Sequence, residues 1–262
     1  MEFMISYEKA KNAFDKFLQG YELSDGKIKL KLIHTFEVAK LSEYIAKDLN
    51  LEKEDLELAK VIALLHDIGR FEQARQYDDY VDHRTVDHAD YGVMMLSNNN
   101  FIRKFVDSDE YDSIILAAIK NHNKYQIESG LSEKELLHTK LIRDADKTDN
   151  FRVKKVDDVK DMANIDEKVM INQEITDEIY NDFLNHKTIL LTKRKTFADM
   201  WVSYIAQIFD YNFTSGLKYL RENDYINILI DRFDWKKDDT LKKLEVIRKT
   251  ANDYIDERLS DL

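Results

Sequence analysis

The stretch with the clearest chemical potential is an apolar run that ends in a histidine and an aspartate. Residues 61–65 are all apolar, and His66 and Asp67 follow directly. A run of this kind is expected in a core, and burying an ionisable pair at its end costs free energy unless something binds both groups. Imidazole nitrogen and carboxylate oxygen are both ordinary ligands of divalent metal ions. The pair therefore predicts part of a metal site.

Other residues of the same types lie where they could complete such a site. His34 begins an apolar series with helical steps of three and four, and His122 ends another. His88 and Asp146 also lie beside apolar runs. A single buried histidine is most often a satisfied core residue. Several on separate predicted helices, together with a His-Asp pair, are better explained by convergence on metal ions.

The order of these residues resembles the HD-domain superfamily of metal-dependent phosphohydrolases, over roughly residues 28–150. The resemblance implies an all-helical fold, one or two divalent ions and hydrolysis of phosphate esters. It also implies that Asp67 bridges the two ions where both are bound. Carried over position by position, it implies first-metal ligands His34, His66, Asp67 and Asp146, and second-metal ligands His88 and His122.

The sequence departs from the family pattern at two positions. Two-metal members usually have a second histidine directly after the one that matches His122, and this chain has Asn123. Many members have lysine three residues after the His-Asp pair, where this chain has Arg70, which keeps the charge but changes its shape. The Gly-Tyr-Pro signature of the cyclic-dinucleotide phosphodiesterase subfamily is absent, because the chain has no proline. We expect a second ion, bound more weakly because of Asn123.

Positive side chains near the predicted ligands are candidates to bind phosphate oxygens. Residues 71–86 have the least helical pattern of this half and predict a polar, aromatic loop beside the metal site. Arg70 lies one helical step after Asp67 and is predicted to be catalytic, the alternative being a surface ion pair with Glu72 or Asp78. The predicted substrate-binding residues are Arg70, Arg75, Arg84 and His83, the alternative for the last three being exposed surface positions.

The ligand types predict a hydrolytic mechanism. A divalent ion lowers the pKa of bound water from about 16 towards 7, and the resulting hydroxide attacks phosphorus. Asp67 is thus predicted to be both ligand and catalytic residue. Asp149, one helical step after Asp146, is predicted to orient a ligand, with a surface ion pair as the alternative. Ligands free of sulfur suit manganese, iron, magnesium, nickel or zinc without distinguishing them.

The rest of the chain predicts an all-α fold. Six glycines and no proline among 262 residues are few for a globular protein, and both residue types break helices. Ser132 and Glu135 have the spacing of a helix-capping box. The helices are predicted over residues 5–19, 29–49, 53–67, 87–97, 110–123, 132–150, 172–186, 196–212, 215–222 and 238–258.

These helices are predicted to form a single domain over residues 1–262. Its HD metal-binding core spans residues 28–150, and a C-terminal helical extension over residues 160–262 packs on that core. An amphipathic stripe from Phe197 to Ile208 is interpreted as core, and His138 and His186 as structural or exposed.

Composition limits the partners. The net charge of −11 argues against a nucleic-acid duplex, which selects a basic surface. The absence of cysteine excludes disulfides and thiolate metal ligands. The N-terminus lacks the pattern of a signal peptide, and no apolar run is long enough to span a membrane. We expect a cytoplasmic protein with a small phosphorylated substrate, such as a nucleotide or another small phosphate ester; the oligomeric state is left open.

Three functions are compatible with these residues. The first is a metal-dependent phosphohydrolase that acts on a nucleotide or related phosphomonoester or diester through a metal-activated hydroxide. The second is a catalytically weak or silent regulatory module that binds a nucleotide or metal, for which Asn123 leaves room. The third is a helical interaction protein whose histidines belong to the core. The intact His66-Asp67 pair and Asp146 favour the first.

Overall fold

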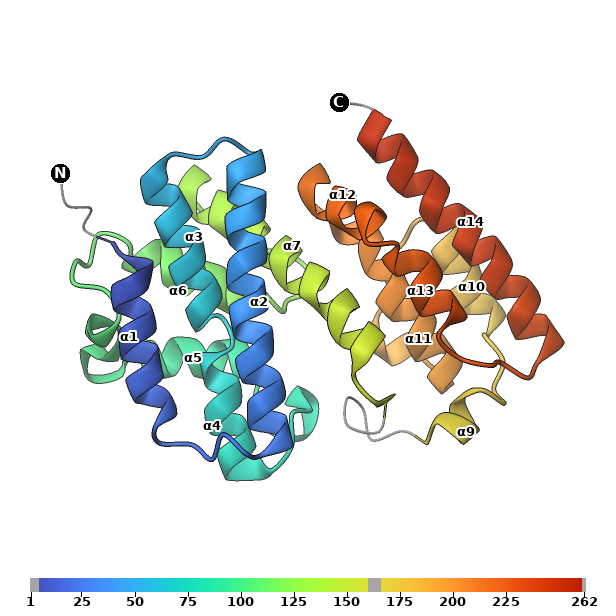
Figure 1. The fold of residues 1–262 in the computed structure, drawn as a ribbon, viewed down its shortest axis with the longest axis horizontal. Coiled ribbons are helices and arrows are strands. Elements are labelled where there is room, and N and C mark those ends of the chain that lie inside the picture. The colour runs from blue at the N-terminus through green and yellow to red at the C-terminus, as the bar shows by residue number, and fades with distance from the viewer. Residues whose placement is uncertain (1–4, 160–165, 261–262) are drawn as a thin grey trace. The chain divides into compact units, whose positions relative to one another are not determined.

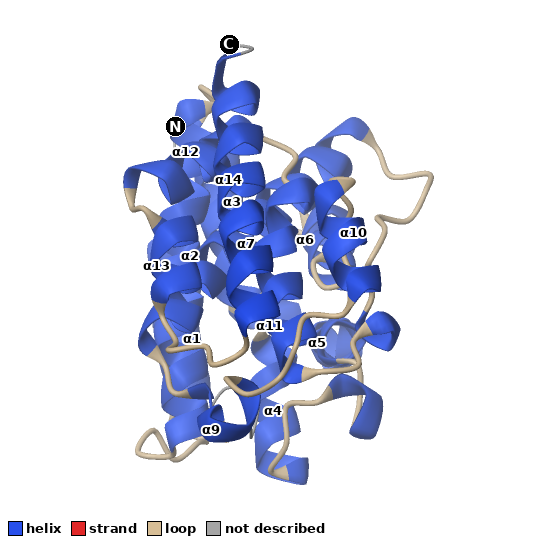
Figure 2. Ribbon diagram, turned by 90° about the vertical axis from the view of Figure 1, so that its right-hand side faces the viewer, coloured by secondary structure: helices blue, strands red, loops and turns tan. Residues whose placement is uncertain are grey.

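The structure is a computed structural model, and it describes residues 5–159 and 166–260. These residues form helices and connecting loops, and none of those described lies in a strand (Figure 2). The predicted all-α fold is confirmed.

The chain divides into two compact units, residues 1–149 and residues 150–262. The long helix α7 (Glu133–Val156) contains the boundary between them (Figure 1). All the predicted metal ligands belong to the first unit. The expectation that the chain is one domain, with its C-terminal helices packed on the metal-bearing half, stays a prediction.

The helices of the first unit surround a core to which every one of them contributes buried residues. Two short 3-10 helices, η1 (Asp82–Arg84) and η2 (Asn98–Lys104), lie in the loops after α4 and α5. Before α7, the helices are α1 (Tyr7–Leu18), α2 (Gly26–Asp48), α3 (Lys53–Leu65), α4 (Ile68–Tyr77), α5 (His88–Ser97) and α6 (Asp112–Asn121).

Polar side chains fix where several of these helices begin. The Asp25 carboxylate accepts hydrogen bonds from the first amides of α2, and Asp87 does the same for α5. The predicted capping box is present: the Glu135 amide donates to Ser132 Oγ, and the Ser132 amide donates to Glu135 Oε2. These caps set the first residues of the helices that carry His34, His88 and Asp146.

Two glycines allow α4 and α5 to approach closely. A Cβ atom on Gly69 would lie 2.3 Å from the carbonyl oxygen of His88 and 2.8 Å from the amide nitrogen of Gly92. Only a residue without a side chain therefore fits at position 69 in this packing. The contact brings the start of α4, which follows Asp67, against the start of α5, where His88 lies.

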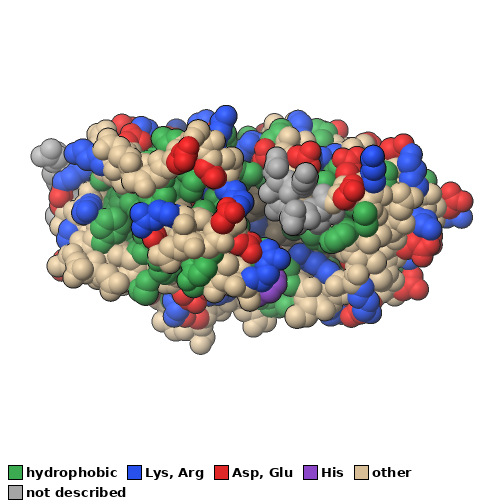
Figure 3. All heavy atoms as spheres, turned by 90° about the horizontal axis from the view of Figure 1, so that it is seen from below, with side chains coloured by type: hydrophobic (Ala, Val, Ile, Leu, Met, Phe, Trp, Pro, Cys, Tyr) green, Lys and Arg blue, Asp and Glu red, His purple; other side chains and the backbone are tan. Residues whose placement is uncertain are grey.

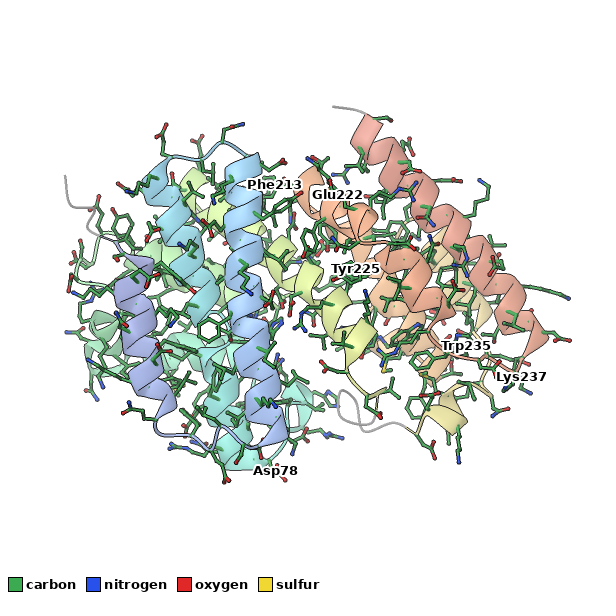
Figure 4. All side chains as sticks on the ribbon, in the orientation of Figure 1. Asp78, Phe213, Glu222, Tyr225, Trp235 and Lys237 are labelled. Atoms are coloured by element: carbon green, nitrogen blue, oxygen red, sulfur yellow. The ribbon has the colours of Figure 1, made fainter. Side chains whose placement is uncertain are left out.

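The prediction of a loop over residues 71–86 is wrong for its first half. Helix α4 continues through Tyr77 and ends at Asp78, which has the left-handed φ of 52° (Figure 4). The helix was not predicted because its buried face includes the polar residues Glu72 and Gln73, so the sequence has no apolar helical pattern there. Both side chains form hydrogen bonds within the fold. The loop is restricted to residues 78–87.

The second unit has its own buried core, which includes residues of α11 and of α14. Tyr225 begins α13, and Trp235 lies in the loop before α14 (Figure 4). Two 3-10 helices, η3 (Leu191–Lys193) and η4 (Ala206–Asp210), flank α11. The α-helices are α9 (Glu167–Met170), α10 (Asp177–Leu184), α11 (Phe197–Ile205), α12 (Thr214–Glu222), α13 (Tyr225–Asp231) and α14 (Asp238–Ser260).

Several predicted helices of this unit have different bounds. The one expected over 172–186 is replaced by α10, which begins only at Asp177, and the one expected over 196–212 is divided into α11 and η4. Helix α13 was not predicted. It follows α12 after a short turn in which Asp224 has a left-handed backbone conformation. The predicted stripe is largely core, although Phe197 at its start is 37% exposed.

Candidate metal centre

All the predicted ligands converge in one cluster inside the first unit. Each is held by the beginning, the end or the middle of a different helix, except that His66 and Asp67 share the junction of α3 and α4. The histidines and Asp67 are buried, and the Asp146 side chain is 18% exposed. The cluster consists of His34 on α2, His66, Asp67, His88 at the start of α5, His122 at the end of α6 and Asp146 on α7.

The Asp67 carboxylate lies between two pairs of imidazoles. Its Oδ2 atom is 3.6 Å from Nε2 of His34 and 3.6 Å from Nε2 of His66. Its Oδ1 atom is 3.3 Å from Nε2 of His88 and 3.7 Å from Nε2 of His122. Each oxygen therefore faces its own pair of ring nitrogens, as a bridging carboxylate does.

Asp146 adds a second carboxylate to only one of these pairs. Its Oδ1 atom is 3.1 Å from His34 Nε2 and 4.0 Å from His66 Nε2. On the other side, Asn123 occupies the position after His122, and its amide donates to the Asp87 carboxylate at 3.2 Å. The first pair of imidazoles thus has two carboxylates available, whereas the second pair shares Asp67 alone.

Hydrogen bonds at Nδ1 orient the Nε2 atoms of the first pair. Nδ1 of His66 is 2.7 Å from the carbonyl oxygen of Ala63, and Nδ1 of His34 is 2.6 Å from Oδ2 of Asp149. A carbonyl oxygen only accepts, so the His66 proton is on Nδ1 and its Nε2 lone pair is exposed to the cluster. This Nε2 is buried and has no hydrogen-bond partner among residues 5–159 and 166–260. The contact of Asp149 matches the prediction that it orients a ligand.

The second pair has the same arrangement. Nδ1 of His122 is 2.7 Å from the carbonyl oxygen of Ile119, and Nδ1 of His88 is 2.7 Å from Oδ2 of Asp82. Both Nε2 atoms are thereby directed to Asp67 and lie 2.9 Å from each other. Two neutral imidazoles with facing lone pairs repel, and a cation held between them removes that repulsion. Residues of this type and tautomer fit a divalent ion.

Burial keeps two of these histidines neutral. It lowers the pKa of His66 to about 4 and that of His88 to about 4. Burial also opposes ionisation of Asp67, but Lys31 and the surrounding histidines hold its pKa well below the usual value. Neutral imidazoles around an ionised carboxylate are the protonation states that a divalent ion requires.

His34 differs from the other histidines. Burial and Lys31 act to lower its pKa, yet its hydrogen bonds to Asp146 and Asp149 raise the pKa above the ordinary value. Burial acts to raise the pKa of Asp146, but its hydrogen bond to His34 and the charges of His34, His66 and His122 hold this pKa below the ordinary value. This end of the cluster therefore has the largest concentration of negative charge.

Sequence reasoning missed two charged residues at the cluster. Lys31 Nζ is 2.8 Å from Asp67 Oδ2, and its position one helical turn before His34 could have indicated it. Asp82 lies in η1, and its two oxygens bind His88 Nδ1 and Arg70 Nη1, the latter at 2.5 Å. No helical spacing links Asp82 to a ligand, so no comparable pattern could have indicated it.

Arg70 lies beside the cluster and is held by the following loop. Its Nη1 atom donates to Asp82 and to the Tyr80 carbonyl oxygen, at 2.6 Å. Its Nε atom is 3.8 Å from Asp67 Oδ1 and is buried without a hydrogen-bond partner. The proposed partners Glu72 and Asp78 instead bind other residues.

The other three predicted substrate residues lie on the surface of the described chain. Arg75 pairs with Glu72 at 2.6 Å, and Arg84 pairs with Asp79 at 2.9 Å. His83 is exposed in η1. No contact of these side chains with the cluster is found within residues 5–159. His138 is buried against Asp55 at 3.0 Å, in agreement with a structural role.

An all-helical unit with a buried cluster of histidines and aspartates around one shared carboxylate defines a class of metal-binding proteins. The comparison with protein families identifies it further: residues 32–150 match the HD domain. Residues 32–150 therefore form an HD domain, and this domain characterises a superfamily of metal-dependent phosphohydrolases. Searches of curated proteins and of solved structures found no match.

The surface adds two findings. Acidic and basic side chains are interspersed over the face shown in Figure 3, in keeping with the high content of both. No helix in the described part of the chain combines the length and the apolarity that crossing a bilayer requires.

Proposed function

We propose that the protein is a metal-dependent phosphohydrolase that acts on a small phosphate ester, a nucleotide or a related phosphomonoester or diester. The observation that supports this most directly is the placement of two imidazole pairs against the two oxygens of Asp67. The family match over the same residues supports the reaction class.

The cluster residues have separate parts in this proposal. A divalent ion, when bound, supplies a water of lowered pKa and positive charge for the phosphoryl oxygens. His34, His66, Asp67 and Asp146 hold the first ion, and His88 and His122 share Asp67 to hold a second. Nitrogen and oxygen ligands suit manganese, iron, magnesium, nickel or zinc.

Two cations beside the cluster are placed to bind the phosphate group. Lys31 and Arg70 both lie within 4.0 Å of an Asp67 oxygen. The buried Nε of Arg70 is a donor for which none of the described residues provides an acceptor. Together they would offset the repulsion between Asp67 and the negative charge of the substrate, and would stabilise the charge that develops in the transition state.

The second candidate function is a regulatory module that binds a nucleotide or metal without turnover. It is favoured by Asn123, which binds Asp87 instead of adding a ligand to the second imidazole pair. The two functions differ in whether product is released.

A screen for phosphate release tests the proposal. Purified protein with added manganese is incubated with phosphomonoesters, nucleotides and cyclic dinucleotides, beside Asp67→Ala as the inactive control. Turnover that requires both the metal and Asp67 supports the hydrolase. Tight binding of a nucleotide without turnover, across all three substrate classes and several metals, would support the regulatory module instead.

A further inference from the structure

Tyr80, in the loop after α4, has a buried hydroxyl group without a hydrogen-bond partner among the described residues. The residue as a whole is partly exposed, so the polar end of its side chain lies inside the protein. A tyrosine near the surface normally directs its hydroxyl to water, and a buried hydroxyl normally has a partner. Leaving this donor unpaired costs free energy, which indicates an acceptor that is not among the described residues.

Other contacts hold Tyr80 in this place. Its carbonyl oxygen accepts a hydrogen bond from Arg70 Nη1 at 2.6 Å. The amide of Val81 donates to Oδ1 of Asp79 at 3.0 Å, and the carbonyl oxygen of Val81 accepts from Thr85 Oγ1 at 3.1 Å. The loop is therefore held by bonds in which the Tyr80 hydroxyl has no part.

The ring of Tyr80 lies beside both cations of the metal centre. Lys31 Nζ and Arg70 Cζ are each 5.9 Å from its centroid. The same cations approach the shared carboxylate, since Lys31 Nζ is 2.8 Å from Asp67 Oδ2 and Arg70 Nε is 3.8 Å from Asp67 Oδ1. Their side chains are 16% and 15% exposed, so this edge of the cluster reaches solvent. Tyr80, Lys31 and Arg70 thus lie around one place next to Asp67.

At neutral pH the Tyr80 hydroxyl is a donor without charge. Burial and the negative charges of Asp67 and Asp25 raise its pKa above the ordinary value, against the effect of Arg70. The effect of Asp67 on this group agrees with the placement of the ring beside the cluster. The hydroxyl can therefore add a hydrogen bond to a ligand without adding positive charge.

The two cations also have donors for a ligand at the same place. Lys31 has N–H groups beyond the one that binds Asp67, and Arg70 Nε has no acceptor within the described chain. Together with the Tyr80 hydroxyl, donors from α2, α4 and the following loop are available to one ligand.

We propose that the Tyr80 hydroxyl donates a hydrogen bond to a phosphate oxygen of the substrate, beside Lys31 and Arg70. An oxygen anion is the acceptor that suits all three groups, because ammonium, guanidinium and hydroxyl groups all bind phosphate oxygens. The proposal rests on the proposed function, which places a phosphate group next to Asp67. It does not need turnover, so the binding of inorganic phosphate tests it directly.

Phosphate affinity is measured by calorimetry on the manganese-loaded full chain, with chloride as the reference salt at the same ionic strength. Tyr80→Phe keeps the ring and removes only the hydroxyl. It should weaken phosphate binding by roughly tenfold, because a hydrogen bond to a charged acceptor is lost, and should leave the manganese content unchanged. Tyr80→Ala, which also removes the ring, should bind phosphate no more tightly than Tyr80→Phe.

The matched control is Tyr77→Phe. Tyr77 is the last residue of α4 and is 45% exposed, so the loss of its hydroxyl should leave phosphate binding unchanged. Three results would overturn the proposal. They are the absence of phosphate binding above the chloride reference in the wild type, equal phosphate affinities in Tyr80→Phe and Tyr77→Phe, and a loss of manganese in Tyr80→Phe.

Stability without phosphate separates a binding hydroxyl from a structural one. Metal-free Tyr80→Phe in chloride should have a Tm equal to or above that of the wild type, because a buried unpaired hydroxyl is removed. With manganese bound, phosphate should raise the Tm of the wild type more than that of Tyr80→Phe. A clear loss of Tm in metal-free Tyr80→Phe would show that the hydroxyl stabilises the fold, and would count against a role in binding.

These measurements also separate Tyr80 from the reaction. If the screen finds no turnover but Tyr80→Phe weakens phosphate binding, the hydrolase proposal fails and the role of Tyr80 stands. If the screen finds turnover but Tyr80→Phe binds phosphate as tightly as Tyr77→Phe, the hydrolase proposal stands and Tyr80 does not bind the phosphate group.

Discussion

Nε2 of His88 and Nε2 of His122 face each other at 2.9 Å, and both rings have their Nδ1 atoms bound to acceptors. No described residue lies between the two lone pairs. The pair is therefore arranged for a cation, and the carboxylate that faces both of its Nε2 atoms is that of Asp67, which also faces His34 and His66. We therefore expect the ion at His34 and His66, where two carboxylates are available, to bind before the ion at His88 and His122.

The first prediction concerns the shared carboxylate. Asp67→Ala should abolish binding at the first site and weaken the second, because both imidazole pairs lose their common ligand. Elemental analysis of the purified variant measures this. Asp79→Ala, which removes the surface partner of Arg84, is the control and should retain wild-type metal content. Unchanged metal in Asp67→Ala would contradict the assignment.

The second prediction concerns the weaker ion. Titration of chelator-treated protein should show a second ion at high metal concentration. Asn123→His should strengthen it, because an imidazole replaces an amide that now binds Asp87. Calorimetry gives both affinities. A stoichiometry that never exceeds one ion per chain, in either protein, would exclude the second site.

The third prediction concerns Arg70. Arg70→Ala should leave the metal content unchanged but lower kcat. The activation free energy should rise by about 2–4 kcal/mol, by analogy with the loss of an oxyanion donor. Arg70→Lys should recover part of the rate, since the charge remains but the fork geometry is lost. Steady-state kinetics on one active substrate, with elemental analysis, checks this. Wild-type kcat in Arg70→Ala would remove Arg70 from the site, and loss of metal would make its role structural.

The fourth prediction concerns the contact between α4 and α5. Gly69→Ala should lower the free energy of unfolding by about 1–3 kcal/mol, because the new methyl group meets backbone atoms of α5. Gly26→Ala is the matched control, since nothing lies within 4 Å of its Cβ position. It should be neutral or stabilise by roughly 0.4–1 kcal/mol. Urea unfolding compares the two, and equal effects would show that α5 moves aside freely.

The fifth prediction concerns pH. In the folded protein the pKa values of His66 and His88 are about 4, against an ordinary value of 6.5. Between these values the unfolded chain binds more protons, so the stability of metal-free protein should fall as the pH falls from about 6.5 towards 4. Unfolding by urea at several pH values tests the slope. His88→Gln should make it shallower, whereas the exposed His83→Gln should not change it.

Helical spacing and the order of ligand types were enough to predict the elements that carry His34, His66, His122 and Asp146. The predictions failed where tertiary packing, rather than pattern, decides the structure. Helix α4 has a polar sequence, yet Glu72 and Gln73 are buried within the fold. The same limit applies to Asp82, which reaches His88 through a loop.

The hydrogen bond between His34 and Asp149 joins residues 115 positions apart. Contacts of such long sequence separation form late in folding, because a large loop must close before they contribute. During synthesis, the first-metal site cannot be complete until α7 has left the ribosome, although His34, His66 and Asp67 are made much earlier. Ion capture is therefore an event of the finished first unit, and a bound ion stabilises that unit against unfolding.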